Sequence, residues 1–175
     1  ALTGFPFLSG FYSKDAIIEF AYLKGNTTGY YAAGIGIFTA FLTSIYSWRL
    51  IFKTFHGEYN NKEINIEETH ESPLVMLVPL VILSIGSIFA GFLFKDLFIG
   101  HGGVNNFWAE SIKFLEPLST DHPPTWFLLL TPCLVLFSIP ISYYFFLKNK
   151  ELSRQIADMN KPLYNFLINK WYFDE

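Results

Sequence analysis

The sequence predicts an all-α, polytopic transmembrane helical protein with one broken helix, three membrane spans and an amphipathic C-terminal tail. The composition is 51% apolar and 19% aromatic with only 15% charged residues, unlike the average soluble domain. Charge is absent from Tyr30 to Trp48, Ser72 to Phe94 and Pro123 to Leu147. Each run is long enough to cross a hydrocarbon core of about 30 Å. None carries the polar stripe typical of a helix in a soluble core.

The first element, residues 1–24, is an apolar stretch interrupted by Lys14, Asp15 and Glu19. Its beginning is rich in helix breakers, because Pro6 cannot donate a backbone hydrogen bond and glycines flank it. We therefore expect a broken helix. In lipid such a break is tolerated only where protein or water satisfies the freed backbone groups, which favours an interior position.

Lys14 and Asp15 are the residues expected to carry chemistry. An ionisable side chain in the hydrocarbon costs roughly 2.5 to 3.5 kcal/mol, so each needs a partner or water. A lysine suits proton transfer because burial favours its neutral form and a nearby carboxylate favours its charged form. The alternative is a lysine that reaches the membrane interface from near a helix end, with Asp15 as its neighbour. Glu19 is expected nearer the interface.

Residues 30–52 form the next transmembrane helix. Small residues recur there at a spacing of four and favour close approach of another helix: Ala32, Gly36, Ala40 and Ser44. Simple helix packing is the interpretation we accept for this face. A link over residues 53–71 follows the helix.

Two more transmembrane helices, residues 72–95 and 123–148, flank a link over residues 96–122. In the first of them, Gly86 with Ala90, and Ser87 with Gly91, offer a second small-residue surface. Cys133, the only cysteine, lies in the last helix, so neither a disulfide framework nor a cysteine metal cluster is available.

Residues 149–175 predict an amphipathic segment. Apolar residues fall near helical spacing among charged neighbours: Ile156, Met159, Leu163, Phe166 and Leu167. Pro162 should divide this helix into two pieces. A plain solvated tail is an equally open interpretation.

Basic residues predict the orientation in the membrane. With three crossings after the first element, the link after Trp48 and the tail share one side, which holds eight Lys and Arg against three on the other. The positive-inside rule makes that side cytoplasmic, or the matrix in a mitochondrion. The link over residues 96–122 then faces outward.

Other classes of site are excluded by pattern. The four histidines lie in predicted links without a ligand-like companion at short spacing: His56, His70, His101 and His122. No phosphate-binding glycine loop or nucleophile elbow occurs. The net charge is −3 and there is no basic cluster, so the sequence does not indicate a nucleic-acid partner. The chain lacks an initiating methionine and opens inside apolar sequence, which indicates a segment of a longer protein.

Residues 1–15, which read Ala-Leu-Thr-Gly-Phe-Pro-Phe-Leu-Ser-Gly-Phe-Tyr-Ser-Lys-Asp, resemble the broken-helix signature of the antiporter-like, proton-pumping subunits of respiratory complex I. Within that family, residues 46–57, 70–73 and 169–175 are similar to later segments of the subunit 5 branch. The resemblance runs the whole chain and corresponds to the C-terminal part of that subunit.

The resemblance implies a function in proton translocation coupled to quinone reduction, with Lys14 and Asp15 in the outward half of the proton path. It implies no catalytic, cofactor or metal residue here, because NADH, FMN, iron–sulfur clusters and ubiquinone are bound by other subunits. The family's other key residues, a glutamate and a lysine in earlier helices, are absent, so this chain alone should not pump.

The implied partners are the rest of subunit 5, the neighbouring antiporter-like subunit, other complex I membrane subunits and membrane lipids. The tail would lead into a long lateral helix on the matrix side. The implied location is the mitochondrial inner membrane, with a bacterial plasma membrane as the alternative.

Two other functions stay open at this point. Subunits of multisubunit sodium/proton antiporters share parts of the same signature, and a long lateral helix after Glu175 would favour complex I instead. In a purely structural membrane subunit, Lys14 would merely pair with Asp15, and its replacement would leave proton pumping unchanged.

Overall fold

The computed structural model describes residues 1–57, 71–99, 107, 108, 111 and 123–173. These residues contain helices and no strand, which confirms the predicted all-α class. Most of the predicted links over residues 53–71 and 96–122 lies outside the described residues, as do His70, His101 and His122. His56 is exposed at the end of its helix.

The elements follow one another as a series of helices and short helical turns. They are α1 (Ser9–Leu23), α2 (Thr27–Phe55), α3 (Leu74–Phe98), α5 (Thr125–Tyr143), the π-helical turn η2 (Tyr144–Lys148), α6 (Lys150–Met159), α7 (Lys161–Ile168) and the 3-10 turn η3 (Lys170–Tyr172). Three helices of the described chain are long and apolar enough to cross a membrane: Thr27–Phe55, Leu74–Phe98 and Thr125–Lys148.

The α2 helix is longer at both ends than the predicted residues 30–52. At its start the Asn26 side chain accepts a hydrogen bond of 2.7 Å from the Gly29 backbone nitrogen, the cap that an asparagine commonly supplies. At its end Lys53 lies in the last turn, where a cation complements the unsatisfied carbonyl groups. Polar residues therefore extend the helix beyond its apolar centre.

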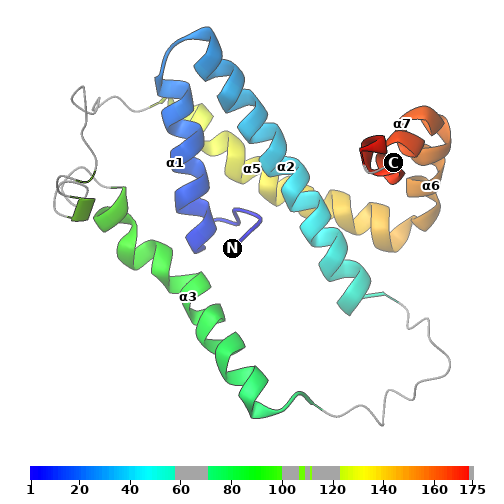
Figure 1. The fold of residues 1–175 in the computed structure, drawn as a ribbon, viewed down its shortest axis with the longest axis horizontal. Helices are drawn as coiled ribbons and strands as arrows, with labels where there is room; N and C mark the ends of the chain where they lie inside the picture. Colours follow the sequence, from blue (N-terminus) through cyan, green and yellow to red (C-terminus); the bar gives the residue numbers. More distant parts are fainter. Residues whose placement is uncertain (58–70, 100–106, 109–110, 112–122, 174–175) are drawn as a thin grey trace.

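Successive long helices run in opposite directions, so that α1 and α3 run one way and α2 and α5 the other (Figure 1). The short α1 helix lies between α3 on one side and α2 with α5 on the other, and it contacts all three (Figure 1). This agrees with the interior position expected for the broken helix.

Polar side chains join α2 to α5. The Ser44 and Ser138 hydroxyl oxygens are 2.5 Å apart, and Ser138 also donates to the Val135 carbonyl at 2.6 Å. Further along, Ser142 donates to the Ile45 carbonyl at 3.4 Å. Small hydroxyl residues at a helix interface allow close approach and hydrogen-bond across it.

The small-residue face of α2 differs in one position from the prediction. Ala40 and Ser44 are fully buried, and Gly36 lies against α1, but Ala32 is exposed while Ala33 is buried. A spacing of four residues overshoots one helical turn by about 40°. Three such steps therefore carry Ala32 about 120° away from Ser44.

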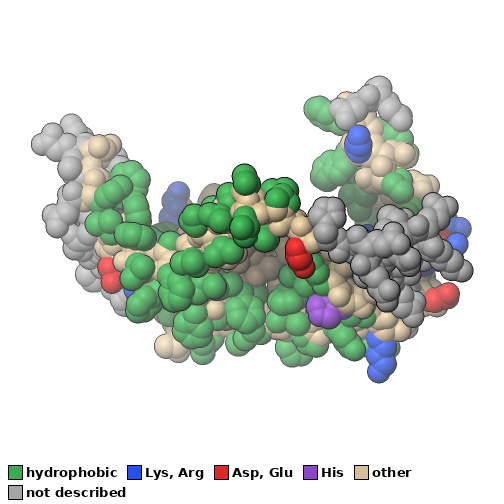
Figure 2. Space-filling model, turned by 90° about the horizontal axis from the view of Figure 1, so that it is seen from below, with side chains coloured by type: hydrophobic (Ala, Val, Ile, Leu, Met, Phe, Trp, Pro, Cys, Tyr) green, Lys and Arg blue, Asp and Glu red, His purple; other side chains and the backbone are tan. Residues whose placement is uncertain are grey.

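Large apolar side chains cover much of the described surface (Figure 2). The α3 helix has no buried residue although it is strongly apolar along its length, and Cys133 on α5 is exposed. Helices that are apolar all round are typical of a lipid environment or of burial against partners.

As predicted, the tail forms two helices and not a single one. The break lies at Asn160, between α6 and α7, and Pro162 occupies the first turn of α7. A proline fits that position because its missing N–H would have no helical partner there. The α6 helix contacts η2, which follows α5, and α7 contacts α6 (Figure 1).

Candidate functional site

The site begins with the irregular residues 1–8 that precede α1. Gly4 and Phe7 have positive φ angles of 72° and 69°, a conformation that glycine adopts without steric cost. At Gly10 the Ala1 carbonyl occupies the place of a β-carbon, so the segment folds back on the start of the helix. The predicted broken helix is thus a folded-back segment followed by 15 helical residues, which rise only about 22 Å.

Two opposite faces of α1 pack against different helices. Ile18 is 4% exposed and forms a cluster with Ala33 of α2 and Phe127 of α5. On the other face, Ser9 and Tyr12 meet Gly91 of α3. Lys14, Asp15 and Glu19, the charged residues of α1, are each partly buried in this arrangement.

Ser9 forms two hydrogen bonds that connect the start of α1 to α3. Its hydroxyl oxygen accepts a hydrogen bond of 2.8 Å from the Gly91 backbone nitrogen and donates one of 3.0 Å to the Gly86 carbonyl. A β-carbon at Gly91 would lie 2.5 Å from the Ser9 α-carbon. Only glycine allows the two backbones to approach this closely.

Lys14 lies one helical turn before Ile18, on the same face of α1. The folded-back segment packs over its side chain, since a β-carbon at Gly4 would be 3.2 Å from Lys14 Cδ and 3.8 Å from Nζ. The Nζ atom is buried and has no hydrogen-bond partner among the described residues. Burying an amine without a partner is costly, so this position is unusual for a lysine with a packing role alone.

Asp15 and Glu19 are half-buried and lie one turn apart along α1. Helical geometry places Asp15 about 100° from Lys14, and Lys14 Nζ makes no hydrogen bond to it. Two carboxylates at this spacing repel each other when both are charged. The three ionisable groups therefore form one electrostatic cluster in which the charge of each affects the others.

Some surroundings of the site were not foreseen from the sequence. Lys95 Nζ lies 5.6 Å from the centroid of the Tyr12 ring, and both residues line an open pocket of about 350 Å³ between α1 and α3. Ser9 and Ser13 line it too. The glycines of α3 signalled close packing, but nothing in the local pattern named α1 as the partner.

In the described part of the chain, no group of three or more His, Cys, Asp or Glu residues could hold a metal ion. The cluster can instead exchange protons, since amine and carboxylate side chains both change charge by gaining or losing one.

The chain is similar along its whole length to known proteins. It is 41% identical over 182 residues to NADH-ubiquinone oxidoreductase chain 5 of Phytophthora infestans. It is 37% identical over 185 residues to the protein of that name in Marchantia polymorpha, and 37% identical over 182 residues to the one in Arabidopsis thaliana.

Each of these alignments covers 100% of this chain and 27% of the relative. The chain therefore spans about a quarter of the length of the curated relatives it matches, in their C-terminal part. No family model matches the chain.

Proposed function

We propose that this chain, a relative of the C-terminal part of NADH-ubiquinone oxidoreductase chain 5, helps to move protons across a membrane within that enzyme. In the relatives' name, NADH and ubiquinone are the electron donor and acceptor. The three apolar helices of the chain fit a membrane subunit. The relatives named above all come from eukaryotes, which supports the mitochondrial inner membrane as the location.

One observation carries the proposed role of Lys14. Its amine is buried without a hydrogen-bond partner among the described residues, beneath the irregular segment that precedes α1. Such an amine is easily neutral, and an approaching proton or a hydrated carboxylate can charge it. Lys14 therefore accepts a proton from the membrane interior and releases it on the outward side.

Asp15 acts in this scheme through its charge. A carboxylate next to Lys14 favours the charged amine, and its protonation or movement favours the neutral one. Glu19, one turn further toward the outward end of α1, couples to Asp15 in the same way. The transfer is then a change of charge on Lys14 that its carboxylate neighbours bias, without any bound cofactor in this chain.

The rest of the proton path lies outside this chain. The chain covers 27% of its relatives, so the groups that deliver the proton to Lys14 belong to the remainder of subunit 5 and to the neighbouring antiporter-like subunit. The redox chemistry, with its FMN, iron–sulfur clusters and quinone, belongs to other subunits of the complex.

The two alternative functions have weaker support. The similar proteins all carry the name of an NADH-ubiquinone oxidoreductase chain, which favours complex I over a sodium/proton antiporter. A purely structural Lys14 would be expected to pair with Asp15, and no such hydrogen bond is formed.

Replacing Lys14 tests the proposal in the intact, assembled complex. Lys14→Ala is expected to leave NADH:quinone turnover measurable and the complex assembled, but to lower the number of protons pumped per electron, because the amine that exchanges the proton is gone. Reconstituted complex with a pH-sensitive dye in the vesicle lumen gives this ratio.

Lys24→Ala is the matched control, since Lys24 is exposed just after α1. It should pump as the unmodified complex does. A normal ratio in fully assembled Lys14→Ala complex would leave Lys14 a structural residue and end the proposal.

A further inference from the structure

We propose that a basic pocket between the end of α2, η2 and the α6–α7 pair binds the phosphate group of an anionic phospholipid. The pocket has a volume of about 560 Å³, within the range of small-molecule sites. It lies apart from Lys14, so this inference stands independently of the proton-transfer role.

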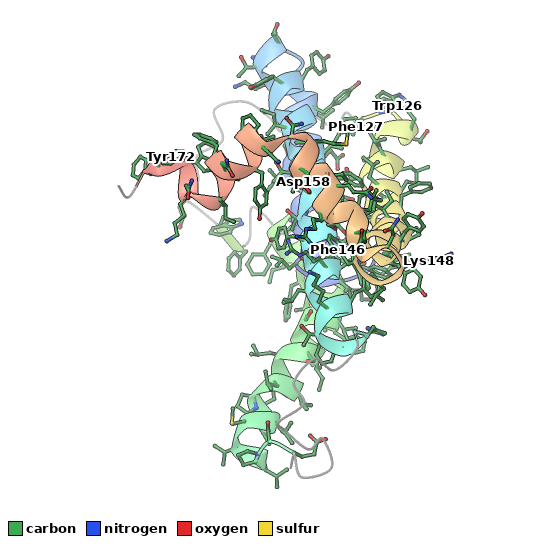
Figure 3. All side chains as sticks on the ribbon, turned by 90° about the vertical axis from the view of Figure 1, so that its right-hand side faces the viewer. Trp126, Phe127, Phe146, Lys148, Asp158 and Tyr172 are labelled. Carbon is green, nitrogen blue, oxygen red and sulfur yellow. The ribbon has the colours of Figure 1, made fainter. Side chains whose placement is uncertain are left out.

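Three cations from two parts of the chain converge on the pocket. Arg49 and Lys53 come from successive turns near the end of α2, and Arg154 comes from α6. None of the described residues that line the pocket is acidic. Asp158, the acidic residue labelled on α6 in Figure 3, does not line it. The pocket therefore has an excess of positive charge that a bound anion would balance.

An aromatic ring fixes part of this arrangement. Phe146 lies in η2 and is labelled in Figure 3. Both α2 cations lie over its ring, with Arg49 Cζ 5.5 Å and Lys53 Nζ 5.9 Å from the ring centroid. A ring face attracts cations but does not neutralise them. Two like charges held over one ring repel each other, and a phosphate between them would relieve that repulsion.

The pocket is partly apolar, and this favours a lipid over a free anion. Ile156 and Leu163 contribute to its lining beside the cations. An inorganic phosphate would leave these side chains without a partner, whereas a phospholipid would place its glycerol and acyl groups there. Basic pockets beside transmembrane helices on the cytoplasmic or matrix side are suited to anionic headgroups.

The position of the pocket along the helices agrees with this assignment. Arg49 and Lys53 lie at the end of a helix that can span the membrane, where lipid headgroups are found. This is also the side on which Lys and Arg are in excess by sequence, eight against three. The tail helices thus close over a lipid headgroup at the membrane boundary.

The experiment uses the intact complex that contains this chain, stripped of lipid and reconstituted with a photoactivatable phosphatidylglycerol or phosphatidylcholine probe. We expect phosphatidylglycerol to label peptides from residues 144–167 and phosphatidylcholine to label them weakly. Each cation near a headgroup contributes roughly fivefold in affinity, so Arg49→Gln with Arg154→Gln should lower labelling about 25-fold.

Lys161→Gln is the matched control, because Lys161 is exposed at the start of α7 and does not line the pocket. It should be labelled as the unmodified complex is. If the double variant does not assemble, the single exposed change Arg154→Gln and the loss of unmodified labelling with added salt make the same test.

Three results would overturn the inference. Equal labelling by the two lipids would mean that the pocket does not distinguish an anionic headgroup from a zwitterionic one. Displacement of the probe by inorganic phosphate, beyond that caused by chloride at equal ionic strength, would assign the pocket to a free anion. Crosslinking of residues 144–167 to an acidic segment of a neighbouring subunit, in place of the lipid probe, would make the pocket a protein interface.

Discussion

Lys14 is held in place by a segment of its own chain. Gly4, with its positive φ of 72°, brings the backbone directly over the Lys14 methylene groups. The amine ends in a buried position without a hydrogen-bond partner among the described residues. A lysine in such surroundings can change its charge after a small displacement, because one new contact or one water molecule alters its stabilisation strongly.

The Gly4 contact gives a prediction at this scale. Gly4→Ala places a β-carbon 3.2 Å from Lys14 Cδ in a backbone conformation that costs a non-glycine residue roughly 1–2 kcal/mol. We expect the segment and Lys14 to shift and the protons pumped per electron to fall. Reconstituted complex gives this ratio together with quinone turnover.

Gly34→Ala provides the control for that substitution, since no atom lies within 4 Å of a β-carbon built at Gly34. It should leave both quantities unchanged. Equal effects of the two substitutions would mean that the packing over Lys14 does not affect proton transfer.

At the scale of elements, α1 is a short helix clamped between neighbours. Ile18 packs toward α2 and α5, and Ser9 bonds to two backbone groups of α3. A helix of 15 residues is marginal by itself, so these contacts determine where its charged residues lie. Movement of α3 against α1 would move Lys14 and Asp15 as well.

Gly91 gives the matching prediction for the α1–α3 contact. Gly91→Ala would bring a β-carbon within 2.5 Å of the Ser9 backbone, and because backbone cannot yield easily, we expect overpacking to cost about 1–3 kcal/mol. The change should lower the thermal stability of the membrane part of the complex, measured by its unfolding midpoint.

Gly86→Ala, on the same helix, adds the same atom into open space and should be neutral. If Gly86→Ala destabilised the complex as much as Gly91→Ala, the close approach of α1 and α3 would be contradicted.

The sequence located elements well where the signal is local. A run of about 20 apolar residues needs no knowledge of its neighbours to be recognised as a span, and Lys14 and Asp15 stand out because charge is rare in such surroundings. Contacts between distant segments could not be predicted this way. The hydrogen bond between Ser9 and Gly91 joins residues 82 positions apart. The prediction that Ala32 packs with Ser44 was wrong because residues four apart are rotated by about 40° from one another on a helix.

At the scale of the whole molecule, the helices alternate in direction and leave large apolar surfaces exposed (Figure 2). The α3 helix has no buried residue. An isolated water-soluble chain would not tolerate surfaces of this size, so lipid or other subunits must cover them.

The alternation of helices predicts opposite sides for the two ends of α2. In a Cys133→Ser background, we expect Asn26→Cys to react with a membrane-impermeant maleimide from the outward side and His56→Cys from the opposite side. Sealed vesicles of known orientation make the measurement. Labelling of both positions from one side would contradict α2 as a membrane span.

The central claim is that Lys14 exchanges a proton, rather than merely supplying a positive charge. Lys14→Arg separates these roles, because a guanidinium keeps the charge and the length but does not release its proton in proteins. The deciding measurement is the proton-to-electron ratio of assembled Lys14→Arg complex in vesicles. The account predicts quinone reduction with a clearly lowered ratio. An unchanged ratio would contradict it, because a fixed charge at this position would then be sufficient.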